Sequence, residues 1–202
     1  MKLHYSSASP YARKVLICAV ELGLRDRIEV VTSIVLPTAP NAAVAALNPL
    51  MKVPTLLRDD GSPLYDSVVI CEYLDTLAKG KLFPREGEPR WQALRIQALA
   101  DGIMDAALLM RYETTVRPEA LRWSAWVDGQ RLKITQALDV LDAQADDAKG
   151  RFHIGDVATA CALGYLDFRF AHDPWRPGRA ALTAWFDALS QRDSILSTIP
   201  TA

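Results

Sequence analysis

Residues 48–74 constrain the fold of this chain more than any other stretch of its sequence. The apolar run at residues 55–57 is typical of a short strand, and Asp60-Gly61 is a strong signal for a two-residue hairpin turn. Residues 63–65 follow as the returning strand. A helix then begins at Asp66-Ser67, because the apolar side chains behind it lie at helical spacing; they are Val68, Val69, Ile70, Tyr73 and Leu74. The sequence therefore predicts a hairpin that leads directly into a helix.

The start of this helix is suited to a small polar ligand. The first backbone N–H groups of a helix have no partner within the helix, and they favour negatively charged groups. Asp66 and Ser67 add a carboxylate and a hydroxyl at the same place. Both residue types are also common helix caps. The residues alone therefore leave two interpretations open, a capping role and a ligand-binding role.

The same stretch carries a resemblance to a known family. Lys52-Val53-Pro54, followed after the hairpin by Asp66-Ser67, resembles the glutathione-binding half of the cytosolic glutathione transferases. The resemblance implies a cis Val53–Pro54 bond, although only about 5–6% of X–Pro bonds in folded proteins are cis. It also implies that the Val53 backbone pairs with the cysteine of glutathione. Asp66 and Ser67 would hold the γ-glutamyl end, and Lys52 would meet the glycyl carboxylate. The family usually has Glu where this chain has Asp66, which shortens the reach by one methylene.

The first thirty or so residues predict a β-α-β unit. Residues 2–5 form a short strand, residues 11–22 a helix, and residues 28–31 a second strand whose continuous apolar character predicts burial on both faces. Residues 36–48 contain prolines around an Ala-rich patch, which is typical of a short irregular helix. With the hairpin and its helix, the order is β-α-β-α-β-β-α. This is the thioredoxin-like layout, a mixed sheet flanked by helices.

The composition changes after this domain. Residues 79–89 are charged and rich in Gly and Pro, as expected of a linker. No convincing strand follows, and helical patterns occupy residues 90–116, 119–145, 154–171 and 179–191. Residues 100–113 and 160–169 resemble helices of the second domain of the glutathione transferases. The predicted architecture is thus an α/β thioredoxin-like domain at 1–78, a linker at 79–89 and an all-helical domain at 90–202. A His at 153 stands where the family usually opens its core helix with a capping Ser or Thr, so this helix is expected to lose about 1 kcal/mol if nothing else caps it.

The expected chemistry lies at Ser9-Pro10-Tyr11-Ala12, between the first strand and the first helix. A glutaredoxin has Cys-Pro-Tyr-Cys in this position, and a Ser and an Ala there cannot carry out dithiol–disulfide exchange. The Ser9 hydroxyl and the helix N-terminus can instead stabilise the thiolate of a bound ligand. A stabilisation of about 2–3 kcal/mol lowers a thiol pKa of about 8.5 by roughly two units.

Ser9 matches the catalytic serine of the serine-type transferases, and Pro10 after it suits the first position of a helix. Ser6 and Ser7 stay alternatives, because alignment within a run of serines is ambiguous. A capping role for Ser9 is compatible with a catalytic one. Arg13 would add positive potential one turn further on, but an Arg-Lys pair at 13–14 is more typical of a solvated helix face.

The site for the electrophilic acceptor is less clearly marked. In the family it lies between the two domains, against the first helix of the second. Met104, Leu108, Arg111 and Tyr112 fall on or near one face of the helix at 90–116, although methionines at helical spacing more often belong to the core. The candidate pocket residues are Tyr11, Leu108 and Tyr112. The sequence does not specify the acceptor.

Charge and composition exclude several other classes. The net charge of −1 gives no reason to expect nucleic acid or an anionic membrane as a partner. The N-terminus lacks the apolar stretch of a signal peptide, and no apolar run approaches the roughly 18–20 residues of a membrane span. The three cysteines, Cys18, Cys71 and Cys161, are expected to be buried free thiols in a reducing cytoplasm. No His or Cys pair has metal-ligand spacing, so no metal is expected.

The sequence therefore predicts a cytoplasmic glutathione transferase that adds the glutathione thiolate to a small hydrophobic electrophile. The resemblance further implies a homodimer, with an interface formed by residues 72–82 and the long helix from residue 90. One alternative is a glutathione-dependent thiol reductase or isomerase, which would need Cys at position 9. Another is a non-catalytic binding protein, because a fold does not fix a function.

Overall fold

The computed structural model describes residues 1–148, 150 and 152–201. Residues 149, 151 and 202, which fall within the predicted domain 90–202, lie outside the described residues. The chain divides into two compact units. Residues 1–85 together with those from Asp193 onward form the N-terminal unit, and Glu86–Arg192 form the helical unit. The residues from Asp193 onward thus belong with the N-terminal unit, whereas the sequence assigned them to the helical domain.

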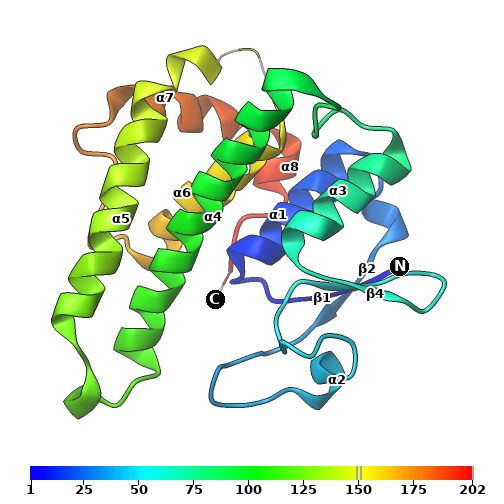
Figure 1. Ribbon diagram of the computed structural model, residues 1–202, viewed down its shortest axis with the longest axis horizontal. Helices are drawn as coiled ribbons and strands as arrows, with labels where there is room; N and C mark the ends of the chain where they lie inside the picture. Colours follow the sequence, from blue (N-terminus) through cyan, green and yellow to red (C-terminus); the bar gives the residue numbers. More distant parts are fainter. Residues whose placement is uncertain (149, 151, 202) are drawn as a thin grey trace. The chain divides into compact units, whose positions relative to one another are not determined.

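The N-terminal unit is built on a four-stranded mixed sheet (Figure 1). Its strands follow the order β2-β1-β3-β4; they are β1 (Lys2–Tyr5), β2 (Glu29–Thr32), β3 (Thr55–Leu57) and β4 (Pro63–Leu64). β1 is parallel to β2, and β3 is antiparallel to both β1 and β4. The helices are α1 (Pro10–Glu21), the single-turn α2 (Ala42–Ala45) and α3 (Ser67–Ala78), with a 3₁₀ turn at Arg25–Arg27. α1 and α3 pack side by side. The element order confirms the predicted β-α-β-α-β-β-α layout.

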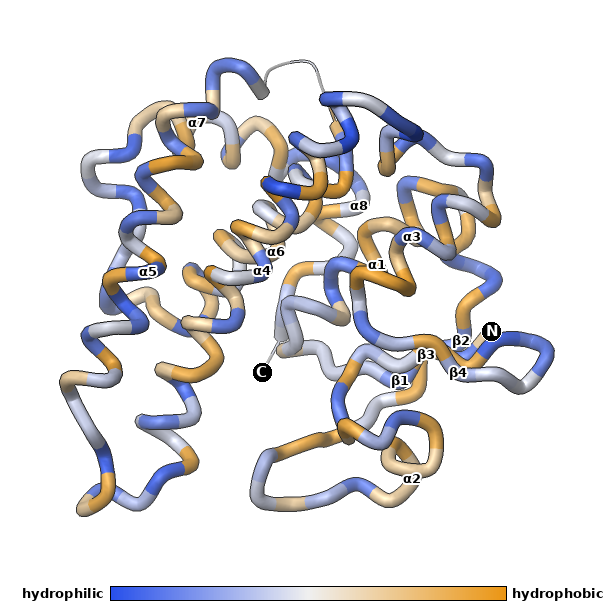
Figure 2. The backbone as a smooth tube through the Cα atoms, in the orientation of Figure 1, coloured by the Kyte–Doolittle hydropathy of each residue, from blue (hydrophilic) through white to orange (hydrophobic). Residues whose placement is uncertain are grey.

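The predicted hairpin between β3 and β4 forms, but its loop has three residues, Asp59-Asp60-Gly61, instead of the predicted two-residue turn at Asp60-Gly61. The Arg58 N–H donates to the Ser62 carbonyl at 3.0 Å, and the Asp60 carboxylate accepts from the Ser62 N–H at 2.9 Å. Gly61 has a φ of +81°, a left-handed conformation that glycine adopts without strain. The tip is hydrophilic, in contrast to the apolar stretches along α1 (Figure 2). The turn fixes the register that leads into α3.

The predicted burial of the second strand on both faces is wrong. Ile28 before β2 is buried, but Glu29 and Thr32 are exposed, and Val30 and Val31 are only partly covered. The reason is topological. β2 pairs only with β1 and lies at the edge of the sheet, where neighbouring elements cover it less completely than a central strand.

The helical unit contains no strand among its described residues, as predicted. Its helices are α4 (Gly87–Thr115), α5 (Ser124–Ala143), α6 (Ile154–Arg169) and α7 (Ala180–Leu189), with 3₁₀ turns at Glu119–Leu121 and Asp146–Ala148. α6 is buried along most of its length and packs against α4. At Gly155 a Cβ atom would lie only 2.9 Å from the Ala93 carbonyl oxygen of α4. This close approach requires glycine at the start of α6.

His153 caps α6, so the predicted loss of a cap does not occur. Its Nδ1 accepts from the Gly155 N–H at 3.1 Å and from the Asp156 N–H at 3.4 Å. The Asp156 carboxylate accepts the His153 N–H in return, at 2.8 Å. A ring nitrogen thus takes the place of the usual hydroxyl in a complete capping box.

The expectation of a solvated face at Arg13 and Lys14 is also wrong. Arg13 is 5% exposed and Lys14 is fully buried. Short helix α8 (Asp193–Leu196) packs on α1, and the Arg13 guanidinium donates to the Ile195 carbonyl at 3.2 Å. The segment that covers Arg13 comes from the far end of the chain. A local sequence pattern therefore gave no signal of it.

Candidate glutathione site

Three segments of the N-terminal unit converge at one end of the sheet. His4 near the end of β1 pairs with Thr55 at the start of β3, and Leu56 of β3 pairs with Leu64 at the end of β4. The residues that follow β1, precede β3 and follow β4 therefore lie at the same end of the sheet. They include Ser9, Val53-Pro54 and Asp66-Ser67, the core of the predicted site.

Both longer helices of the unit begin at this end of the sheet. α1 starts one residue after Ser9, and α3 starts at Ser67. The unpaired N–H groups and the positive dipole ends of two helices favour negative charge there. The arrangement suits a ligand with a thiolate or a carboxylate.

Ser9 is the N-cap of α1. Its Oγ accepts the Ala12 N–H at 3.2 Å, and its backbone is extended. In this contact the oxygen accepts and the hydroxyl proton is not used. The partly exposed Ser9 side chain can therefore cap the helix and donate a hydrogen bond to a ligand at the same time.

The two alternative serines differ from Ser9. The Ser7 hydroxyl donates to the Thr201 carbonyl at 3.2 Å, so its proton is already used within the protein. Ser6 accepts the Ser9 N–H through its carbonyl at 3.0 Å, which closes the turn after β1. Of the three, Ser9 alone caps the helix. Which of the three serines meets a ligand stays a prediction.

The Val53–Pro54 bond is cis, which confirms the prediction. Neither the N–H nor the C=O of Val53 has a hydrogen-bond partner among the residues that the structure describes. The preceding Lys52 carbonyl is fixed by Asn48 Nδ2 at 3.3 Å and by the buried Thr55 hydroxyl at 2.8 Å. The Lys52 side chain is exposed. The backbone is thus held on one side of Val53, while the polar groups of Val53 stay available.

Asp66 takes the capping role that the sequence left open, and neither Asp66 nor Ser67 is thereby excluded from ligand binding. Asp66 is the N-cap of α3, and its Oδ1 accepts the Val68 N–H at 2.9 Å. Its carboxylate is nevertheless exposed. Ser67 is 3% exposed, and its hydroxyl has no partner among the described residues. Capping by Asp66 is therefore established, and both side chains can still meet a ligand.

The candidate acceptor residues lie in separate units. Tyr11 is in the first turn of α1 and is partly exposed. Leu108 and Tyr112 are partly exposed residues of α4 in the helical unit. Met104, by contrast, is fully buried and belongs to the core. Burial raises the pKa of the Tyr112 hydroxyl above its ordinary value, and the nearby Arg111 charge opposes this effect.

Sequence reasoning missed two polar residues of α6. Tyr165 is 3% exposed and Arg169 is partly exposed, and both interact electrostatically with Arg111 of α4. Burial is the main cause that raises the Tyr165 pKa and lowers the Arg169 pKa. The available signal was a Tyr and an Arg four residues apart at the end of an otherwise apolar helix.

All three cysteines are buried free thiols, as predicted. They are placed in α1, α3 and α6. Among the described residues, no group of three or more His, Cys, Asp and Glu side chains could hold a metal ion. No helix within the described part of the chain is long and apolar enough to span a membrane.

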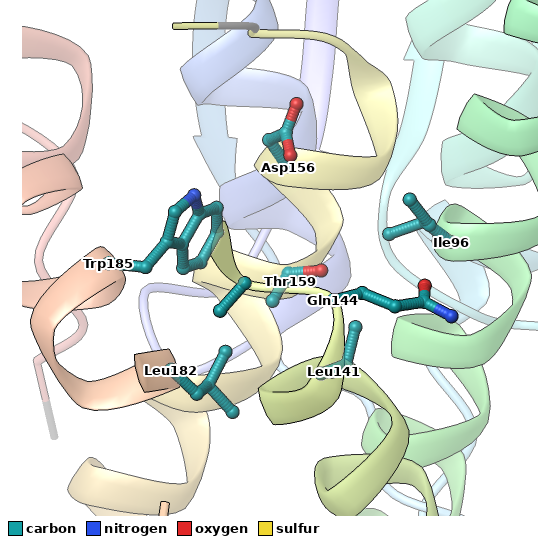
Figure 3. Close-up of a pocket in the computed structure, with 8 residues that line it drawn as sticks. Ile96, Leu141, Gln144, Asp156, Thr159, Leu182 and Trp185 are labelled. Carbon is teal, nitrogen blue, oxygen red and sulfur yellow. The ribbon is translucent and has the colours of Figure 1, made fainter. Parts of the chain in front are cut away.

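A small pocket in the helical unit does not coincide with the predicted site (Figure 3). It lies among α4, α5, α6 and α7; its lining residues are Ile96, Leu141, Gln144, Ala145, Asp156, Thr159, Leu182 and Trp185. Its buried carboxylate, Asp156, is already engaged in the capping box of α6. The pocket is therefore a gap between packed helices.

Fold and site together define a thioredoxin-like domain with Ser9 at the start of α1, followed by an all-helical unit. Comparison with known families agrees with this class. Residues 8–77 match the N-terminal domain of the glutathione S-transferases, and residues 124–188 match the C-terminal domain. The chain belongs to the glutathione S-transferase family.

Individual relatives match over almost the whole chain. An uncharacterized GST-like protein of Escherichia coli K12, YibF, is 35% identical over 99% of this chain and 98% of its own length. A glutathione transferase family member from Pseudomonas fluorescens Pf-5, solved with bound glutathione, is 46% identical with a TM-score of 0.97, over 100% of this chain and 99% of that one. Another structure from the same organism, solved with S-(propanoic acid)-glutathione, is 44% identical with a TM-score of 0.92, over 99% of each chain.

Proposed function

We propose that this protein is a glutathione transferase that adds the thiolate of glutathione to an electrophilic carbon of a small molecule. The observation that carries the proposal is the geometry of Ser9. Its oxygen caps α1 while its hydroxyl proton stays available. Ser9 lies at the end of the sheet where Val53 has unpaired backbone groups and α3 begins. A ligand held there by its peptide backbone brings its thiol to a hydroxyl donor and a helix N-terminus.

In the proposed reaction the thiol loses its proton to solvent, because the site lowers its pKa. The Ser9 hydroxyl donates to the sulfur and stabilises the thiolate. The sulfur then attacks the electrophilic carbon and a C–S bond forms. With an aryl halide the halide leaves with its electron pair, and with an activated alkene a proton from water completes the product. No redox change occurs.

Glutathione is proposed to bind through the residues that the sequence singled out. Val53 pairs its N–H and C=O with the cysteine residue of the ligand, and Asp66 and Ser67 hold the γ-glutamyl end. Lys52 meets the glycyl carboxylate from its exposed position. The relative that was solved with bound glutathione supports glutathione as the ligand, because its identity of 46% extends over the whole chain.

Conjugation is favoured over thiol–disulfide exchange. Exchange needs a cysteine that forms a mixed disulfide, and positions 9 and 12 are Ser and Ala. The three cysteines are buried elsewhere in the fold. The relative solved with S-(propanoic acid)-glutathione supports this choice, because its ligand carries carbon on the glutathione sulfur.

We also propose a homodimer in the cytoplasm, and an acceptor that contacts Tyr11, Leu108 and Tyr112.

The test is the pH–rate profile of conjugation with glutathione and an aryl halide, for the wild type and the Ser9→Ala variant. At a pH of about 6.5 the variant is expected to be ten- to a hundredfold slower, which corresponds to about 1.4–3 kcal/mol for one hydrogen bond to a charged group. Higher pH recovers part of the loss, because solvent then deprotonates the thiol.

The matched control is Ser7→Ala, which removes a neighbouring hydroxyl that is bonded to Thr201. Its profile should follow the wild type. Ser9→Cys should weaken conjugation and introduce disulfide reduction. Superimposable profiles for the wild type and Ser9→Ala would mean that Ser9 acts only as a cap.

A further inference from the structure

The helical unit holds two arginines and two tyrosines together, here named the arginine–tyrosine cluster. Arg111 and Tyr112 are neighbours in α4, and Tyr165 and Arg169 lie four residues apart on one face of α6. α4 and α6 pack against each other over much of their length (Figure 1). The side chains of Tyr165 and Arg169 hydrogen-bond to each other. Tyr165 is also within electrostatic range of Arg111 and Tyr112, and Arg169 is within range of Arg111.

The two arginines lack a carboxylate partner among the described residues. Other arginines of the same unit do pair, as Arg176 does with Asp167 and Arg179 with Asp139. Arg169 Nε is buried without a hydrogen-bond partner, and its guanidinium lies 4.0 Å from the Phe168 ring centre. Burial, and then the like charge of Arg111, lower the Arg169 pKa. Two like charges held together in a partly buried place favour a bound anion.

The tyrosines complete a donor set for a carboxylate. Burial raises the pKa values of Tyr112 and Tyr165, so both hydroxyls stay protonated at neutral pH and can donate. A guanidinium presents a planar fork that binds both oxygens of a carboxylate. Leu108, one turn before Arg111 and Tyr112, adds an apolar surface beside them. This combination recognises an organic acid rather than a free inorganic ion.

We infer that the arginine–tyrosine cluster binds the carboxylate of a small organic acid, and that the acceptor substrate is an electrophile carrying such a group. The inference rests on the proposed function, and on the expectation that the acceptor contacts Leu108 and Tyr112. The sequence predicts a small hydrophobic acceptor. The inferred acceptor is instead amphipathic, apolar around the reacting carbon and acidic at one end.

The first experiment measures binding without chemistry. Phenylacetate and its neutral amide, phenylacetamide, are titrated into the whole protein by NMR. The wild type is expected to bind phenylacetate at least about tenfold more tightly than the amide, since hydrogen bonds to charged groups are the stronger ones. The affinity for phenylacetate should fall by about ten- to a hundredfold in Arg111→Met and in Arg169→Met, and by about tenfold or less in Tyr165→Phe. The affinity for phenylacetamide should stay unchanged in all three variants.

Arg95→Met is the matched control. Arg95 lies on α4 and is exposed, and among the residues that the structure describes it donates only to Gln144, at 3.3 Å. Its loss changes the net charge equally. Arg169→Lys keeps the charge and loses the fork, and it should recover part of the affinity. This variant keeps the test valid if Arg169→Met fails to fold. Equal affinity for acid and amide in the wild type, or equal losses in Arg95→Met, would overturn the inference.

The second experiment compares an aryl halide bearing a carboxymethyl group with its methyl amide, each rate divided by its uncatalysed rate. The acid should have a kcat/KM at least about tenfold higher, and Arg111→Met and Arg169→Met should remove that preference through KM. If neither compound is turned over, the proposed function fails, and phenylacetate binding still decides the anion site. If the amide is turned over as well as the acid, conjugation stands and the acidic acceptor is wrong.

Discussion

The Ser9 oxygen and the Ala12 amide nitrogen lie 3.2 Å apart at the start of α1. This one contact gives Ser9 a structural role, because it satisfies a free N–H of the first helical turn. It also leaves the Ser9 proton free for a ligand. A variant that removes the side chain therefore changes both stability and chemistry, and the two effects have to be separated.

Ser9→Ala and Ser9→Gly should separate them. Loss of a capping side chain to Ala costs about 1 kcal/mol, whereas Gly at the same position costs only a few tenths. For a chain of this size that predicts a fall in Tm of about 2–4 °C for Ala and about 1 °C or less for Gly. Calorimetry of both variants measures this difference. An equal fall in both would mean that the cap contributes little.

Asp66→Asn should separate capping from ligand binding at α3. Asn and Asp cap helices about equally well, so Tm should change little. The lost negative charge, however, should weaken glutathione binding about tenfold, because Asp66 is proposed to meet the positively charged γ-glutamyl amino group. Titration calorimetry measures the affinity. Asp26→Asn, an exposed change of equal charge, is the control. Unchanged affinity in Asp66→Asn would reduce Asp66 to a cap.

Helix α8 should stabilise the N-terminal unit through Ile195. Its side chain is 2% exposed, whereas that of Leu196 beside it is 48% exposed. Ile195→Ala should therefore cost about 2–5 kcal/mol, and Leu196→Ala should have an effect within about 0.5 kcal/mol. Urea unfolding of both variants tests this. A similar small loss in both would show that residues after Arg192 are not packed on α1.

Glu113 should make the stability of the helical unit depend on acid pH. The Trp123 N–H bonds its carboxylate at 2.8 Å, and with Arg117 this holds the Glu113 pKa below its ordinary value of 4.5. A lowered pKa in the folded state means that the unfolded state takes up protons first as the pH falls. The stabilisation is therefore present above 4.5 and is lost progressively below it.

Thermal unfolding between neutral pH and about pH 3 measures this dependence. Glu113→Gln should have a lower Tm at neutral pH and a shallower decline with acid than the wild type. Parallel curves for the two proteins would show that the Glu113 carboxylate does not contribute.

The sequence predicted elements whose signals are local. The hairpin at Asp60-Gly61, the starts of α1 and α3, and the four helices of the helical unit depend on turn residues and on periodicity. Their bounds agree within a few residues, except that the short helix expected at 36–48 shrinks to the single turn Ala42–Ala45. Prolines on both sides leave too few residues for a longer helix.

Features that depend on distant contacts were not predicted. Arg13 is buried by a segment about 180 residues later in the chain. Arg111 and Arg169 come within electrostatic range of each other because α4 and α6 pack, and neither helix alone shows a binding pattern. The residues of the candidate glutathione site could be named from sequence because a resemblance supplied them. The sheet register then explained why they lie at one end of the sheet.

If Ser9 stabilises the thiolate of bound glutathione, the pKa of that bound thiol must depend on the Ser9 hydroxyl. Ultraviolet absorbance of the thiolate, followed over pH with saturating glutathione, gives the value for the wild type and for Ser9→Gly, a variant in which the loss of the capping side chain costs the helix only a few tenths of a kcal/mol. We expect a wild-type pKa roughly two units below the free value of about 8.5, and a rise of about one to two units in Ser9→Gly. A bound thiol with the same pKa in both proteins would contradict this role of Ser9.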